Sequence, residues 1–440
     1  MTATPAWLQA GIHAGGSEGL EKTRLNLGFI PLTDCAPLAI ALEKGLFRQY
    51  GLEVTLSRQV SWANIRDKVV AGVLDGAHML AAMPIATTLG LGEVKKPTLA
   101  ALSLDLNGNA ITVAPDLYRR MKEADPLAAL ERPMTARGLA RVIEADREAG
   151  REAMNFAMVF PFSTHNYLLR YWLAASGIVP DRDVRMWVIP PSQMVDCLRC
   201  GDIDGYCVGE PWNEQAVAAG VGRTLVTDYE IWNNHPEKVF GVNQDWAERH
   251  PNTLKAALMA LLEAARWIDQ PENRLEVVDI LAQEEYVNAP QEVVKMSMIG
   301  SFQYDRDEAP LPCPDFNVFH RYAANFPWRS HAVWFVTQMY RWGQLREALD
   351  IGKIAEQAYR PDLYREAAEA LGLPCPGADY KLEGWHGGAW TPEDGDSPEL
   401  GPDLFADGRR FDPADPVGYL RQFETHNLRV SLDELSRFNP

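Results

Sequence analysis

The chain alternates short apolar runs with longer segments of helical periodicity, and it does so twice. The first block predicts a strand, a helix, a strand, a helix and a strand, at residues 25–30, 34–51, 52–60, 62–73 and 75–80. Strands separated by helices in this order are typical of an α/β layer built on a parallel sheet.

A second block with the same order of elements begins near Met154. Its strands and helices are predicted at residues 153–161, 163–177, 184–191, 192–201 and 203–211. Because the order repeats, the sequence predicts two similar α/β lobes in one chain.

The rest of the sequence is expected to join and extend these lobes. Residues 116–150, rich in Arg, Glu and Ala, lead into the second lobe, and the amphipathic helix at 253–269 returns to the first. Residues 377–416, rich in Gly, Pro and Asp, predict an extended wrapping arm. The predicted parts are a tail over 1–23, lobe 1 over 24–115, lobe 2 over 116–228, a return to lobe 1 with helices over 229–376, and a C-terminal arm over 377–440.

The charge of the chain limits its partners. With 42 basic and 60 acidic side chains the formal net charge is −18. Such a chain is a poor partner for nucleic acid or for an anionic membrane surface, because like charges repel. If the ligand is an anion, we expect a pocket that is locally positive.

The chain also shows no pattern for export or for crossing a membrane. The first 21 residues contain no basic start followed by an apolar run, no twin-arginine pair and no lipobox-like cysteine. No later segment approaches the roughly 18 consecutive apolar residues of a membrane span. These features predict a cytoplasmic protein.

Cys197 and Cys200 form a C-x-x-C pair, but at the end of a predicted helix. A redox pair normally opens a helix, where the dipole lowers the pKa of the first thiol. No second C-x-x-C or nearby His completes a zinc set, so we expect buried, reduced structural thiols and no metal or cofactor. The chain also lacks G-x-S-x-G, H-E-x-x-H, P-loop and dinucleotide-binding motifs, which disfavours an enzyme.

Several phrases, taken in order, resemble one protein family. They are LNLGFIPLTDCAPLAIALEKGLF, QVSWANIRDKVVAGVLDGAH, FPFSTHNYLLRYWLAA, VGEPWNEQAV, HPEKVFG, DYKLEGWHGG and DPADPVGYL. They resemble the nitrate- and bicarbonate-binding proteins of bacterial ABC importers and their cytoplasmic nitrate/nitrite-sensor relatives, over roughly residues 24–425. The resemblance implies an α/β, two-lobed periplasmic-binding-protein fold (type II), with the ligand cleft between the lobes and a C-terminal extension.

Within that family, the missing export pattern favours the sensor group. The resemblance then implies a cytoplasmic nitrate or nitrite sensor that releases an RNA-binding antiterminator regulator when the anion binds. The alternative is the substrate-binding receptor of a nitrate ABC importer. A remote alternative is an enzyme similar to pyrimidine-precursor synthases, which share the fold but carry a cysteine-rich motif that this chain lacks.

A nitrate ion is small, flat and singly charged, so its site needs in-plane donors and a positive group that offsets lost hydration. The family's motif positions correspond here to Trp62, Asn109, His165, Gly209 and Lys238. Lys238 supplies a compact cation, and His165 adds a donor at a helix start, where free N–H groups favour an anion. In bicarbonate-binding relatives the position of Lys238 is acidic and goes with a metal, so lysine implies nitrate or nitrite without a metal.

The other positions have narrower expected roles. Trp62 offers its indole N–H or its ring, and Gly209 lets the backbone approach the ligand without a Cβ. Asn109 stands where nitrate receptors carry Gln, so its amide reaches about 1.5 Å less far. Glu210 is expected to anchor the hinge and His78 to be a structural or hinge residue. Three further residues are expected to brace the cleft mouth: Asp34, Arg66 and Trp212.

The predicted site residues do not decide between nitrate and nitrite, but they predict the effect of a substitution at Lys238. Nitrate and nitrite present planar oxygens of similar size and charge, so the residues do not separate them. The substitution Lys238→Glu is expected to abolish oxyanion binding and to leave the fold intact.

Overall fold

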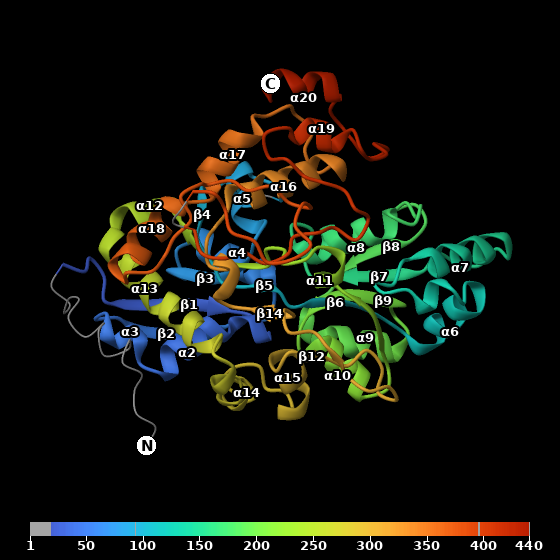
Figure 1. Ribbon diagram of the computed structural model, residues 1–440, viewed down its shortest axis with the longest axis horizontal. Coiled ribbons are helices and arrows are strands. Elements are labelled where there is room, and N and C mark those ends of the chain that lie inside the picture. The colour runs from blue at the N-terminus through green and yellow to red at the C-terminus, as the bar shows by residue number, and fades with distance from the viewer. Residues whose placement is uncertain (1–18, 93, 395–396, 440) are drawn as a thin grey trace.

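Two mixed β-sheets lie side by side and form the centres of two lobes (Figure 1). The structure, a computed structural model, describes residues 19–92, 94–394 and 397–439. The first sheet has the order β2 (Glu53–Arg58), β1 (Arg24–Phe29), β3 (Gly76–Leu80), β11 (Lys238–Asn243) and β4 (Thr98–Ser103). The second has the order β10 (Arg223–Thr227), β6 (Asn109–Val113), β9 (Gly205–Gly209), β7 (Asn155–Met158) and β8 (Arg185–Val188).

The two sheets repeat one topology, which confirms the predicted two-lobed α/β fold. In the first, β1 runs parallel to β2 and β3, and in the second β7 runs parallel to β8 and β9. Each sheet then receives one antiparallel strand from a distant part of the sequence: β11 beside β3, and β6 beside β9. The strands that the sequence predicted therefore pair in parallel as expected, and the two added antiparallel strands make both sheets mixed.

The chain crosses between the lobes earlier than the sequence indicated. The strand β6 belongs to the second sheet, although the predicted lobe 1 ran to residue 115. The outward crossing lies beside the returning one: the Asn107 N–H donates to the His235 carbonyl at 3.0 Å, and the Leu104 N–H donates to the Lys238 carbonyl at 2.8 Å. Two paired crossing segments, residues 104–108 and 232–237, thus connect the lobes as a hinge, and we call them the hinge segments.

Helices cover both sheets. Those of the first lobe are α2 (Ala36–Glu43), α3 (Leu46–Gln49), α4 (Trp62–Val70), α5 (Met83–Leu89), α12 (Gln244–Arg249), α13 (Pro251–Ile268) and α18 (Pro361–Ala370). Those of the second are α6 (Pro115–Ala124), α7 (Arg137–Glu148), α8 (Thr164–Ala174), α9 (Met194–Cys200), α10 (Trp212–Ala218) and α11 (Asp228–Ile231). The predicted helix 34–51 is split at Gly45, whose φ of 70° ends α2 and starts α3.

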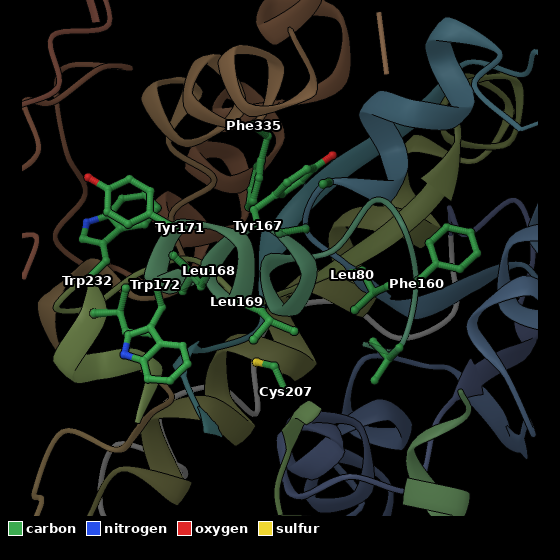
Figure 2. Packing of buried hydrophobic residues seen from close by; sticks show 14 of the residues in the cluster. Leu80, Phe160, Tyr167, Leu168, Leu169, Tyr171, Trp172, Cys207, Trp232 and Phe335 are labelled. Carbon is green, nitrogen blue, oxygen red and sulfur yellow. The ribbon is translucent and has the colours of Figure 1, made fainter. Parts of the chain in front are cut away.

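The remaining elements link the lobes and form the C-terminal part. They are α14 (Arg274–Leu281), α15 (Gln291–Met298), α16 (Arg329–Arg341), α17 (Ile351–Ala358), α19 (Pro416–Leu420) and α20 (Leu432–Phe438), with short strands β5 (Leu106–Asn107), β12 (Ser301–Phe302), β13 (Leu311–Pro312) and β14 (Asn317–Val318). Figure 2 shows Tyr167 of α8 beside Phe335 of α16, with ring centroids 6.0 Å apart. Thus α16, which follows the return to lobe 1, packs against the second lobe.

Aromatic side chains of the C-terminal arm, Phe405 and Phe423, pack on Tyr171 of the second lobe. Phe405 is buried and stacks on Trp232 at 4.8 Å and on Tyr171 of α8 at 5.8 Å. The Trp232 and Phe405 backbones also form an isolated antiparallel bridge. These contacts bury apolar surface at a point where the arm has no regular secondary structure of its own.

Three further expectations concern the Cys197 and Cys200 thiols, the N-terminal tail and membrane-spanning helices. Cys197 is half-buried and Cys200 is exposed, so the prediction that both thiols are buried is wrong; α9 buries Met194, Val195 and Leu198, which turns Cys200 to solvent. Most of the predicted tail over 1–23 lies outside the described residues. Within residues 19–92, 94–394 and 397–439, no helix has the length and apolarity needed to cross a bilayer.

The aromatic stack generates a test of the arm's contribution to stability. We expect Phe405→Ala to lower the free energy of unfolding by about 3 kcal/mol, because it leaves a cavity between two rings. Leu404→Ala, at the neighbouring exposed position, is the matched control and should change it little. Urea denaturation followed by tryptophan fluorescence measures both. Equal losses in the two variants would show that the arm does not unfold with the lobes.

Candidate functional site

The candidate site is a buried polar cluster where the two lobes meet at the carboxyl ends of their strands. After β1, the Thr33 N–H donates to the Glu210 carbonyl at 2.9 Å, and Glu210 follows β9 of the other lobe. Ligands of open α/β folds bind at this end of the sheet. The position agrees with the cleft that the sequence predicts.

Lys238 lies at the centre of the cluster as the first residue of β11. Its side chain is fully buried, and its Nζ lies 2.6 Å from Asp34 Oδ2 and forms an ion pair with Glu237 Oε1. Its backbone N–H donates to Asp105 Oδ1 at 2.9 Å. Burial alone would lower the pKa of Lys238, but the charges of Asp34 and Glu237 outweigh it and raise the pKa, so the ammonium keeps its proton.

Trp62 and His78 line the first-lobe side of the cluster. The Ser61 side chain caps α4 by accepting from the Asn64 N–H, so Trp62 is the first residue of the helix. The Trp62 ring centroid lies 5.6 Å from Lys238 Nζ, and its indole Nε1 is buried with no hydrogen-bond partner in the part of the chain that the structure describes. His78 lies edge-on to Trp62 and places Nε2 2.8 Å from Asp34 Oδ1, which fits its expected structural role.

His165 enters from the second lobe. Ser163 caps α8 by accepting from the Asn166 N–H, which puts His165 in the first turn of the helix. Its Nε2 lies 3.3 Å from Glu237 Oε1, and its Nδ1 is buried without a partner. Burial lowers the pKa of His165 to about 4 despite the nearby charge of Glu237, so the imidazole is neutral at pH 7.

Asn109 and Gly209 complete the second-lobe wall as directly opposed residues of β6 and β9. A Cβ at Gly209 would lie 3.2 Å from Asn109 Oδ1 and 3.5 Å from Asp34 Oδ2. A glycine at position 209 therefore permits the second lobe to approach Asp34, the ion-pair partner of Lys238. The five residues predicted for the site all belong to this one cluster, connected through Asp34 and Glu237.

The sequence analysis did not predict three residues of the cluster: the acids Asp105 and Glu237, and the imidazole of His235. All are fully buried, and all lie on the hinge segments. Alternation along a strand would place Glu237 and Lys238 on opposite faces, which hides the contact. Glu237 precedes β11, however, so its side chain is free of that alternation and turns toward Lys238.

The cluster carries an excess of negative charge, so the expected positive pocket is wrong. Burial would raise the pKa of Asp34, but Lys238 and then His78 outweigh it and keep that pKa below its usual range. Burial would also raise the pKa of Glu237, but His165, Lys238 and His235 outweigh it and lower that pKa, so both groups are carboxylates at pH 7. Burial lowers the pKa of His235 to about 4, as it does for His165, so neither imidazole adds positive charge at pH 7. One ammonium therefore faces two carboxylates.

The residues expected at the cleft mouth take different roles. Arg66 on α4 donates to the Gly92 carbonyl at 3.4 Å and lies over the Phe160 ring of the second lobe at 5.8 Å, so it spans the cleft. Glu210 joins the lobes through its backbone carbonyl, as a hinge anchor would. The Trp212 carbonyl accepts from the Tyr206 hydroxyl at 2.9 Å, within the second lobe. Asp34 is a member of the cluster itself.

Comparison with known proteins gives consistent matches. A family described as the NMT1-like family matches residues 18–282. The nitrate import ATP-binding protein NrtC of Synechocystis sp. PCC 6803 is 39% identical over 97% of this chain, and the bicarbonate transport ATP-binding protein CmpC of the same organism is 38% identical over 96%. The chain spans 60% of the length of NrtC and 58% of that of CmpC.

A solved structure matches over nearly its full length. The crystal structure of the periplasmic nitrate-binding protein NrtA from Synechocystis PCC 6803 superposes with a TM-score of 0.81 and 34% identity, covering 92% of this chain and 99% of that one. The fold is thus the two-lobed periplasmic-binding-protein-like fold that the sequence predicts.

The paired charges generate a stability test. We expect Asp34→Asn to lower the free energy of unfolding by about 3–5 kcal/mol, because it removes a partner from a buried ammonium. The control Asp67→Asn removes an exposed acid 2.7 Å from Arg66 and should cost less than about 1 kcal/mol. Chemical denaturation at pH 7 measures both. A loss for Asp34→Asn no larger than the control's would mean that the cluster does not hold the lobes together.

Proposed function

Since the chain belongs to the NMT1-like family and shares its fold with a nitrate-binding protein over 92% of its length, we propose that it binds nitrate or nitrite in the buried cluster between the lobes. Trp62, Asn109, His165, Gly209 and Lys238 surround the ligand in this proposal. The lobes close on the anion by a hinge motion about the paired crossing segments.

One observation carries the proposal. Lys238 Nζ and His165 Nε2, which come from different lobes, converge on the same atom, Glu237 Oε1. A carboxylate is flat and singly charged with two oxygens, as nitrite is, so the protein's own side chain occupies the position suited to such an ion. We infer that the oxyanion replaces the Glu237 carboxylate between these two donors.

Unsatisfied donors support the same position. The Trp62 indole Nε1 is fully buried without a hydrogen-bond partner within the described residues, and so are both ring nitrogens of His165, one of which carries the single N–H of the neutral imidazole. A buried donor without a partner is costly, by about 1–3 kcal/mol. An oxyanion with three acceptor atoms would relieve this cost, which explains why these donors are kept.

The comparisons favour a receptor over the predicted sensor. NrtC is named as a nitrate import ATP-binding protein, CmpC as a bicarbonate transport ATP-binding protein and NrtA as a periplasmic nitrate-binding protein. We therefore propose the substrate-binding receptor of a nitrate importer as the function. The cytoplasmic sensor with its antiterminator partner, and the enzyme related to pyrimidine-precursor synthases, have less support.

The indole N–H of Trp62 allows nitrate affinity to be tested separately from the stability of the protein. We expect Trp62→Phe to weaken nitrate binding by roughly 10- to 100-fold, since it deletes a donor to an anion. It should not lower the melting temperature, because that N–H has no partner in the empty protein. Calorimetry with nitrate, nitrite, bicarbonate and sulfate measures binding; we expect the first two to bind and the dianion sulfate to be rejected by the negative cluster.

Trp212→Phe is the matched control, since its indole Nε1 is also buried without a partner but lies outside the cluster. It should leave nitrate affinity unchanged. The proposal is wrong if nitrate and nitrite do not bind while bicarbonate does, or if the two tryptophan variants bind nitrate equally well.

The contacts of Lys238 change the expectation for Lys238→Glu. The new carboxylate would join those of Asp34 and Glu237 in a fully buried space, so loss of the fold replaces the intact fold that the sequence suggested. Glu237 is the better position for a test. We expect Glu237→Gln to tighten nitrate binding about tenfold or more at pH 8, because it removes a competing charge.

The pH dependence follows from the same charges. The pKa of His165 is about 4 in the empty protein and a bound anion raises it, so the complex holds more protons than the free protein above pH 4. Nitrate affinity should therefore rise as the pH falls from 8 to 6, by up to about tenfold per unit for each proton taken up. Glu237→Gln should flatten this dependence, because the displaced carboxylate is the other proton acceptor.

Asp228→Asn is the control for Glu237→Gln. Burial raises the pKa of Asp228 to about 8, so this nearby acid is largely neutral at pH 6 to 7 and its amide changes little charge there. Weaker nitrate binding in Glu237→Gln than in Asp228→Asn, at pH 6 to 7, would refute displacement of Glu237 by the anion.

A further inference from the structure

A cavity lies away from the Lys238 cluster, between the end of α8, the end of α16 and the C-terminal arm. Its volume is about 230 Å³, and its lining includes Tyr171, Ile178, Arg341, Asp407 and Phe423. We call it the arm pocket; its walls come from within residues 171–180, 341–342 and 407–427. The residues assigned to the oxyanion site take no part in it.

Arg341 is the residue that makes the arm pocket unusual. It is the last residue of α16 and is only 6% exposed, yet Nε and Nη1 are buried and have no hydrogen-bond partner among the described residues. Burial lowers the pKa of Arg341 to about 10, which still leaves it charged at pH 7. A buried charge with unmade hydrogen bonds is costly unless a partner of opposite charge arrives.

Aromatic rings surround this guanidinium without meeting its hydrogen-bonding needs. The Arg341 Cζ lies 3.7 Å from the Phe423 ring centroid, 4.5 Å from that of Trp342 and 5.2 Å from that of Tyr171. Ring faces attract a cation, but they do not replace the in-plane acceptors that guanidinium N–H groups require. The rings therefore leave Nε and Nη1 of Arg341 without acceptors among the described residues.

The other charged side chains of the arm pocket do not pair with Arg341. Asp407 forms an ion pair with Arg409, and Glu424 lies 2.8 Å from His426 at the exposed rim. The guanidinium of Arg341 therefore has no acid partner among the described residues, and it suits a ligand with a single negative charge. The cavity equals roughly eight water volumes of about 30 Å³ each, so the ligand is small.

We propose that the arm pocket binds a small organic monocarboxylate with an apolar body. Its carboxylate accepts hydrogen bonds from Arg341, because a carboxylate matches the planar fork of a guanidinium. Its apolar body contacts Phe423, Trp342 and Ile178. The pocket is a binding site in addition to the proposed oxyanion cleft and does not depend on what the cleft binds.

Benzoate and benzamide form a matched pair of probes, because they share size and shape and differ in charge. Calorimetry on the full chain should show benzoate binding at least about tenfold tighter than benzamide, since only benzoate pairs with Arg341. Benzoate should also raise the melting temperature, because a ligand that binds the native state stabilises it. Benzoate that produces neither heat nor a thermal shift at 10 mM would overturn the proposal.

Two variants assign the binding to the arm pocket. Arg341→Gln should weaken benzoate binding at least about tenfold, whereas Arg410→Gln, which removes an arm arginine stacked on Trp385 outside the pocket, should not change it. Ala174→Leu, which narrows the pocket without touching Arg341, should also weaken binding and serves if Arg341→Gln does not fold. Unchanged benzoate affinity in the folded variants would place the binding elsewhere and refute the site.

Discussion

The buried ammonium of Lys238 is the interaction on which the cleft depends. It sits between Asp34 of the first lobe and Glu237 of a hinge segment, and without it two carboxylates would be buried with no cation at hydrogen-bond distance. Since breaking a buried ion pair costs about 3–5 kcal/mol, the lysine stabilises the empty protein before any ligand arrives. In the proposed function, an oxyanion enters a site whose positive charge is already neutralised, and it binds by exchange with an internal carboxylate.

This exchange connects ligand binding to the hinge. Asp105, His235 and Glu237 all lie on the two hinge segments, whose backbones are hydrogen-bonded to each other. When an oxyanion takes the place of the Glu237 carboxylate, the side chain that must move belongs to the segment about which the lobes turn. The differential contacts that a ligand needs to shift a two-state equilibrium are thus present in the hinge itself.

The sequence predicted the parts of the fold that depend on local pattern. The strands β1, β2 and β3 and the helix α8 follow from alternation, apolar runs and serine caps. The antiparallel strands β6 and β11 did not, because each pairs with strands far away in the sequence and local pattern does not report pairing. The five site residues came from the resemblance to a family, and the acids around Lys238 were missed because spacing does not reveal which carboxylates meet in space.

The buried cations Lys238 and Arg341 are compensated in opposite ways, and this decides how each site responds to an anion. Lys238 has two carboxylates within hydrogen-bond distance, so a ligand there adds charge to a negative cluster and draws in protons. Arg341 has aromatic rings around it, and a carboxylate ligand would neutralise it directly. Because the pKa of Arg341 remains near 10, its charge does not change between pH 6 and 8. Anion binding in the cleft is therefore coupled to pH through the protein's own acids and imidazoles, whereas binding in the arm pocket follows the ionisation of the ligand alone.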